Sequence, residues 1–291
     1  MKIIKEYKEF VDLQKNYISA MNEMNIDETV DYVIEHCKEF IDNPVNIYRH
    51  IDQYKTKFFR SEPIERVSRD NGNWYTLIMD NSKFWEKYPK RGKSFICSLD
   101  NYSKNFLVIP EDNSKWGICP REDIFYSFDS FCYNIATFFE YFADLSSNLL
   151  GNIIRYDTIE NMKTDIKKLE NYLYSSSEWN NFLEFELYLK NRYDFTYEFI
   201  FKFLDLIWGK DIFISLENFM KPAINDFELC NYTDINNLPK SAYYRECWTD
   251  SKCVFINRDK LQEFLEKLGK KIGKKFEYDI NQYNIISKIK K

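Results

Sequence analysis

The sequence predicts an α+β protein that is mostly helical overall, with a small mixed or antiparallel sheet flanked by helical lobes. Apolar residues recur at three-to-four spacing over the first 60 residues and again between about 157 and 220, which is typical of amphipathic helices. Short runs at 74–79, 94–98 and 105–110 are rich in β-branched and aromatic residues and are bounded by turn residues, as strands are. A composition of 44% hydrophobic and 30% charged residues excludes a disordered chain.

Residues 1–62 are expected to form an N-terminal helical lobe. Apolar positions predict one helix over about 10–24 and a second over about 30–41, for which Asp27 is a candidate cap. Asn43 and Pro44 mark a break. A third helix is expected around Ile47 and Ile51.

Residues 63–155 are expected to hold the small β core and a long aromatic helix. The first two strands are predicted at 74–79 and 94–98. Pro110 to Ser114 reads as a turn, because Pro presets φ and Asp and Asn bond nearby backbone, so 106–109 and 115–119 are predicted to form a hairpin around it. The aromatic helix then runs from just beyond Pro120 towards Leu150.

The second half of the chain is expected to contribute a helical insertion or arm at 156–225 and the remainder of the core at 226–291. Strand-like composition returns at 241–258, so these late strands are expected to complete the small sheet. Asp259 is expected to begin a C-terminal basic helix. We find no internal repeat.

The composition of the chain disfavours several classes of catalytic and binding site. The chain has only 7 Gly and neither a GxGxxG nor a GxxxxGK[ST] motif, which disfavours kinase, Walker-type and Rossmann sites. Seven scattered Cys without a signal peptide indicate a reducing cytoplasm, and two His are too few for a metal site at any recognisable spacing. No apolar run approaches the roughly 20 residues of a membrane span, so no membrane association is expected.

Charge is unevenly distributed. The last 33 residues carry nine Lys against five acidic residues, a local +4, which leaves −9 for the rest of a chain of net charge −5. An acidic body disfavours direct nucleic-acid binding. The basic run 267–275 has two readings, a solvated helix end favoured by the helix dipole or a nucleic-acid contact.

Three segments, in their order along the chain, resemble the ADP-ribosyltransferase core, and the first of them is the predicted strand at 74–79. The run Arg91-Gly92-Lys93-Ser94-Phe95-Ile96-Cys97-Ser98 is similar to that family's serine strand, and Arg245-Glu246-Cys247-Trp248 is similar to its late strand bearing a catalytic Glu. The resemblance implies an ADP-ribosyltransferase-like sheet with Glu246 as the catalytic carboxylate. It also implies Arg91, Ser94 and Ser98 as the groups that bind NAD.

The match is degenerate, and this favours binding over catalysis. The first strand at 74–79 lacks the Arg or His that the family uses to anchor NAD, and the second reads Ser-Phe-Ile-Cys-Ser instead of Ser-Thr-Ser. Structural roles stay open for the same residues: Arg91 would pair with Glu86 or Asp100 at the surface, and Glu246 would be an exposed strand carboxylate.

In size, composition and central lobe with helical extensions, the chain resembles the phage anti-Gabija inhibitors. That resemblance implies a non-catalytic phage- or virus-encoded anti-defence protein in the host cytoplasm, without a cofactor. Such a protein would sterically block a host nuclease complex, with several copies on each target. The sequence does not identify interface residues. The alternatives are a mono-ADP-ribosyltransferase that uses NAD to modify a host protein, and a virion structural protein.

Overall fold

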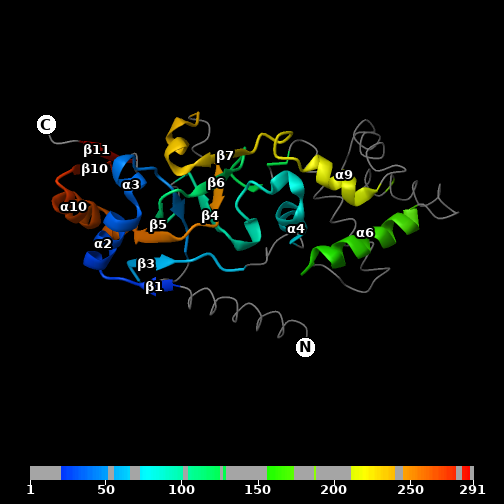
Figure 1. The fold of residues 1–291 in the computed structure, drawn as a ribbon, viewed down its shortest axis with the longest axis horizontal. Coiled ribbons are helices and arrows are strands. Elements are labelled where there is room, and N and C mark those ends of the chain that lie inside the picture. The colour runs from blue at the N-terminus through cyan, green and yellow to red at the C-terminus, as the bar shows by residue number, and fades with distance from the viewer. Residues whose placement is uncertain are drawn as a thin grey trace. The chain divides into compact units, whose positions relative to one another are not determined.

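The computed structural model describes residues 21–51, 56–65, 73–100, 104–124, 127–128, 156–173, 187, 211–239, 245–279 and 284–288. The chain divides into two compact units. The first comprises 1–66, 87–127 and 226–291, and the second comprises 67–86 and 128–225. Figure 1 shows the elements of both.

The described part of the first unit is built on a nine-stranded sheet in which every strand pair is antiparallel. The order across the sheet is β1-β3-β9-β5-β2-β4-β8-β6-β7, so strands far apart in the sequence lie side by side. A separate two-stranded sheet pairs β10 with β11. The strands are β1 (Met21–Glu23), β2 (Tyr48–Arg49), β3 (Phe58–Ser61), β4 (Phe95–Ser98), β5 (Phe106–Pro110), β6 (Lys115–Ile118), β7 (Glu228–Asn231), β8 (Glu246–Thr249), β9 (Cys253–Asn257), β10 (Lys275–Asp279) and β11 (Asn284–Lys288).

The predicted fold class, a mostly helical protein with a small ADP-ribosyltransferase-like sheet flanked by helical lobes, is therefore wrong. The dominant element of the described chain is the nine-stranded antiparallel sheet. The strands are only two to five residues long, so few of them give a clear period-2 signal. The central strands β5 and β9 are buried at every position and read as continuous apolar runs.

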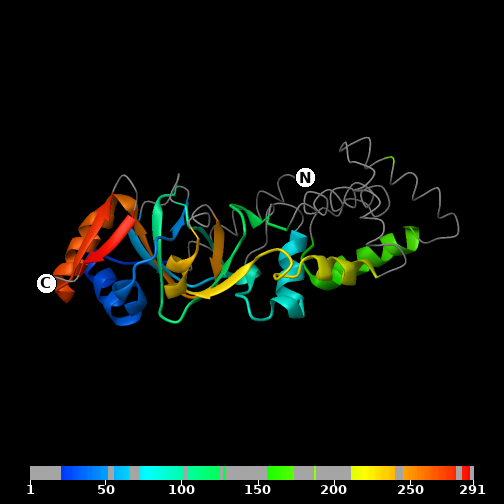
Figure 2. The same ribbon diagram turned by 90° about the horizontal axis from the view of Figure 1, so that it is seen from above.

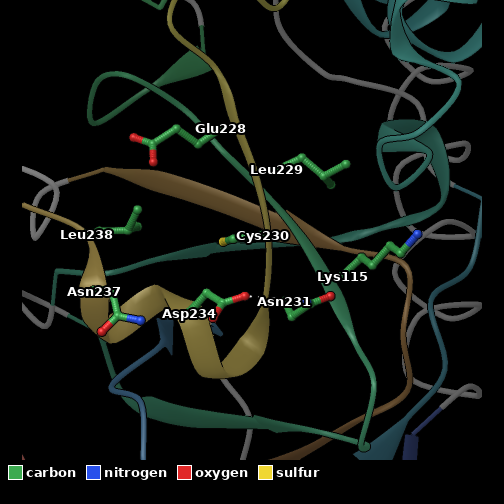
Figure 3. Close-up of a pocket in the computed structure, with 8 residues that line it drawn as sticks. All are labelled: Lys115, Glu228, Leu229, Cys230, Asn231, Asp234, Asn237 and Leu238. Carbon is green, nitrogen blue, oxygen red and sulfur yellow. Dashed lines mark hydrogen bonds between the residues drawn. The ribbon is translucent and has the colours of Figure 1, made fainter.

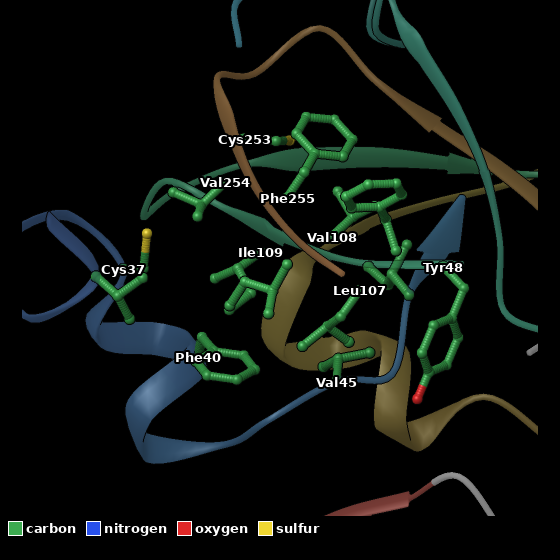
Figure 4. Close-up of a cluster of buried hydrophobic side chains, with 14 of the residues drawn as sticks. Cys37, Phe40, Val45, Tyr48, Leu107, Val108, Ile109, Cys253, Val254 and Phe255 are labelled. Carbon is green, nitrogen blue, oxygen red and sulfur yellow. The ribbon is translucent and has the colours of Figure 1, made fainter. Parts of the chain in front are cut away.

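Three helices of the first unit pack on the sheet: α2 (Ile26–His36), α3 (Lys38–Asp42) and α10 (Leu261–Ile272). Asn25 caps α2 in a capping box with Glu28, which satisfies two otherwise orphaned N–H groups. Figure 4 shows Cys37 and Phe40 from this layer facing Leu107 and Ile109 of β5. Figure 2 shows α10 beside β10. Gly273 ends the helix in the left-handed region, at φ 71°.

The second unit, as far as it is described, is helical. It contains α4 (Trp74–Asn81), α6 (Ile159–Leu173), α9 (Ile212–Phe219) and the 3₁₀ turn η2 (Lys83–Trp85). The buried carboxylate of Glu170 on α6 accepts the backbone N–H of Ile212 at 2.7 Å and so caps α9 from a distance. The Trp85 indole N–H donates to the carbonyl of Met220 at 2.9 Å.

Several predicted elements need correction. The expected first strand at 74–79 is helix α4, and the third helix expected around Ile47 is coil and the two-residue strand β2. Strands at 94–98, 106–109 and 115–119 are confirmed, apart from their ends. They do not form the predicted hairpin, because β5 pairs with β9 and β2 whereas β6 pairs with β8 and β7. The first helix, over 10–24, reaches the described chain only at its end, where 21–23 is strand β1. The aromatic helix does not begin just beyond Pro120 as predicted, because residues 121–123 form a bend, and its predicted continuation beyond 128 lies outside the described residues.

Within the ranges given above, no helix is long and apolar enough to cross a membrane.

Position 117 on β6 has no room for any residue larger than glycine, because the Trp248 ring lies against it. It lies directly opposite Trp248 of β8, and a Cβ placed on it would sit 2.2 Å from Cζ2 of that indole. We expect Gly117→Ala to destabilise the protein by about 1–3 kcal/mol, because the buried ring has to shift. Urea unfolding of the full chain measures this. Gly273→Ala is the matched control, because a Cβ there would contact nothing. Its cost should be limited to the strain of a positive φ, about 1 kcal/mol.

Because several cysteine thiols are buried, we expect the free energy of unfolding to fall at alkaline pH. Burial raises the pKa of Cys119, Cys247 and Cys253 well above the usual range, so the folded chain keeps protons that the unfolded chain releases near pH about 8.5. Each thiol should lower the free energy of unfolding by about 1.4 kcal/mol per pH unit as pH rises above that value. Urea unfolding across this range measures the slope. Cys247→Ala should make it shallower, and an unchanged slope in that variant would contradict the assignment.

Candidate functional site

The sheet brings together two of the four residues that the sequence singled out. Arg91 lies in the short 3₁₀ turn η3 (Arg91–Lys93) just before β4, and Glu246 is the first residue of β8. Because β4 and β8 are neighbours, Nη2 of Arg91 reaches Oε1 of Glu246 at 2.7 Å. The Arg91 side chain is 2% exposed and that of Glu246 is 14% exposed, so a buried guanidinium meets a half-buried carboxylate.

Trp248 covers the ion pair and anchors it. The Arg91 guanidinium carbon lies 5.4 Å from the centre of the indole, a cation–π contact in a desolvated setting. The indole N–H donates to the carbonyl of Pro89 at 2.9 Å, which ties β8 to the segment before η3. Tyr88 stacks on the same ring, and Phe227 meets it edge-on. We call Arg91, Glu246 and Trp248 the lock.

Cys119 adds a third contact to the Glu246 carboxylate. Its Sγ lies 3.6 Å from Oε1 of Glu246, the oxygen that also contacts Arg91. Burial, reinforced by the negative charge of Glu246, raises the pKa of the Cys119 thiol well above its usual range. The sulfur therefore stays protonated at neutral pH and acts as a weak donor to the carboxylate.

The two serines predicted to bind NAD make local backbone contacts. Ser94 lies between η3 and β4, is buried, and donates its hydroxyl to the carbonyl of Lys90 at 2.5 Å. Ser98 ends β4 opposite Glu246, and its Oγ accepts the backbone N–H of Asp100 at 3.0 Å. Both hydroxyls fix the turns at the two ends of β4.

As arranged, the lock is suited to holding strands together. Oxocarbenium-like chemistry requires a carboxylate whose negative charge faces a space that the substrate can enter. The charge of Glu246 is balanced by Arg91, and most of its surface is covered by the protein itself. Arg91 pairs with neither Glu86 nor Asp100 as its predicted surface role required, but with a carboxylate 155 residues away in sequence.

A cavity of about 420 Å³ lies elsewhere, at the last strand of the sheet. Its walls come from β7, from the following 3₁₀ turn η5 (Tyr232–Asn237) and from the start of β6. None of Arg91, Ser94, Ser98 or Glu246 lines it. Figure 3 shows the lining residues Lys115, Glu228, Leu229, Cys230, Asn231, Asp234, Asn237 and Leu238.

The cavity wall combines charged and apolar groups. Glu228 forms an ion pair with Arg245, and the side-chain amide of Asn231 donates to Asp234 at 3.2 Å. Burial, together with the nearby charge of Glu228, raises the pKa of the Cys230 thiol to about 12, so it is not a reactive thiolate. Sequence reasoning missed this surface, since the polar run 231–237 resembles an ordinary loop.

The basic run 267–275 faces acidic residues of α2 and α3. Lys267 pairs with Asp27 at 2.7 Å, Lys271 pairs with Asp31, and Lys274 pairs with Asp42 at 2.7 Å. Figure 1 shows α10 beside α2. These exposed pairs add little stability, but they place carboxylates beside three of the cations that a nucleic-acid contact would use.

The comparisons give no relative to guide the assignment. Searches against protein-family models, curated proteins and solved structures find no match. In the part of the chain that the structure describes, no group of three or more His, Cys, Asp or Glu side chains is arranged to hold a metal ion.

The lock predicts strong coupling between its charged members. Arg91→Met leaves the half-buried Glu246 carboxylate without its cation, and Glu246→Leu leaves the buried Arg91 guanidinium without its anion. Each single variant should destabilise the protein by about 3–5 kcal/mol. The double variant Arg91→Met/Glu246→Leu should recover most of this loss, because it removes both charges. Urea unfolding of the four proteins gives the coupling energy. Additive losses in the double variant would show that the pair does not act as a unit.

Proposed function

We propose that this chain works by binding another protein and not by catalysis. The observation that carries the proposal is the ion pair between the half-buried Glu246 carboxylate and the buried Arg91 guanidinium. Glu246 is the carboxylate that the transferase alternative requires, and here it stabilises the junction of β4 and β8. Arg91, the cation which that alternative assigns to NAD, is the partner that neutralises it.

The particular role that we propose is a phage- or virus-encoded inhibitor in the host cytoplasm, which sterically blocks a host defence complex of the nuclease type. The acidic body of the chain supports this, because negative charge suits a protein that covers a basic DNA channel. The six cysteines within the described ranges are free thiols, as a reducing compartment favours. Several copies on a target with repeated subunits would add avidity.

The test separates binding from catalysis by removing the candidate catalytic groups without leaving a buried charge. Tagged wild-type chain and the double variant Arg91→Met/Glu246→Leu are each used to capture partners from bacterial lysate containing NAD. We expect both to retain the same stoichiometric partner with unchanged intact mass, and both to inhibit the purified partner's nuclease activity equally.

Two control measurements accompany this test. Circular dichroism and urea unfolding establish that the double variant is folded, and NAD consumption by the purified chain reports transferase or hydrolase chemistry without knowledge of the target. An ADP-ribose mass increment on the partner, present with wild type and absent with the folded double variant, would make the chain a transferase. Failure of wild type to inhibit the captured partner would also refute the proposal.

A further inference from the structure

Strand β7 forms an edge of the nine-stranded sheet. It pairs with β6 on one side, and no strand of the described chain pairs with it on the other. Its side chains are half-buried to exposed, in contrast to the buried central strands. An edge strand presents main-chain N–H and C=O groups that another extended chain can bind.

The register identifies which groups of β7 point outward. The backbone N–H of Tyr232 donates to the carbonyl of Ser114 at 3.2 Å, so Tyr232 and Ser114 form a hydrogen-bonded pair that continues the β6–β7 ladder. Hydrogen-bonded pairs alternate along an antiparallel ladder, so Cys230 and Glu228 also bond to β6. The N–H and C=O of Leu229, and the N–H of Asn231, therefore point away from the sheet.

The cavity lies along this same edge. Leu229 and Asn231 both line it, together with the carboxylates of Glu228 and Asp234. Figure 3 shows Lys115 extending away from those carboxylates. Asp234 is exposed, and its neighbour in the wall is the neutral amide of Asn231. An arriving segment would thus meet outward main-chain groups, the separate apolar side chains of Leu229 and Leu238, and the exposed carboxylate of Asp234.

We propose that β7 docks an extended, basic segment of the partner protein as an added strand, with a Lys or Arg side chain seated beside Asp234. This inference rests on the proposed binding function and names its mode. Main-chain bonds to Leu229 and Asn231 would align the segment, as in other cases of strand addition. Glu228 already pairs with Arg245, so the exposed carboxylate of Asp234 is the charge that would attract a cationic side chain.

A second copy of this chain fits the edge less well. Antiparallel pairing of β7 with itself would bring Glu228 and Asp234 of one copy close to the same residues of the other, and like charges across strands are destabilising. The acidic body of each copy adds to this repulsion.

The experiment uses the full chain and two short fluorescent peptides, one alternating Val with Lys and one alternating Val with Glu. We expect the Lys peptide to bind, by fluorescence anisotropy, at least about tenfold more tightly than the Glu peptide. Hydrogen exchange should show protection of the Leu229 and Asn231 amides on binding. N-methylation of alternate residues of the Lys peptide, which removes its donors, should abolish binding.

The matched variants separate main-chain docking from side-chain contact. Leu229→Pro removes an outward N–H and leaves the β6 ladder intact, so the fold should persist while Lys-peptide binding weakens at least about tenfold. Leu229→Ala keeps the N–H and should bind within a few fold of wild type. Asp234→Lys should reverse the preference towards the Glu peptide.

Each contrary outcome overturns the inference. No binding of the Lys peptide by wild type, equal binding of the two peptides, or undiminished binding by a folded Leu229→Pro variant would refute basic strand addition. A dimer that sedimentation shows for wild type and not for Leu229→Pro would assign the edge to a second copy. If Leu229→Pro still captures and inhibits the intact partner, the docking mode fails while the binding function stands.

Discussion

A buried guanidinium fixes the geometry of the sheet around its late strands. Arg91 lies between the Glu246 carboxylate and the Trp248 indole, and neither charge can be removed alone without leaving the other unpaired in the interior. Trp248 fits over Gly117 of β6 because that residue has no Cβ. Through these contacts one cluster joins η3, β4, β8 and β6, and β6 is the one strand of the described chain that pairs with β7.

Local features of the sequence predicted where several strands lie, but not how they pair. β5 and β6 were found from apolar and β-branched residues beside a turn of Pro, Asp and Asn, which are signals that reside within a few positions. β5 pairs with β9, and β6 pairs with β7 and β8, in each case across more than a hundred residues, and no local signal specifies such pairing. The run at 74–79 misled because it is buried at nearly every position, which suits a core helix as well as a strand.

The same reasoning identified residues of the candidate site but not their role. Residue types and order drew attention to Arg91 and Glu246, and the structure places them in contact. The role could not be read from types, because a carboxylate near an arginine serves either a substrate or the fold, and burial decides between them. The β7 edge gave no signal at all, because an edge is defined by sheet order and sheet order depends on long-range pairing.

The position of the lock in the sheet changes how loss of function at Glu246 should be interpreted. β8, which carries Glu246, pairs with β6, and β6 supports the β7 edge. A substitution that leaves Arg91 unpaired therefore disturbs the strand next to the proposed docking surface, and its effect on activity would resemble the loss of a catalytic group. Only a variant that removes both charges and keeps the fold distinguishes the two, because it eliminates the carboxylate without leaving the Arg91 guanidinium unpaired in the interior.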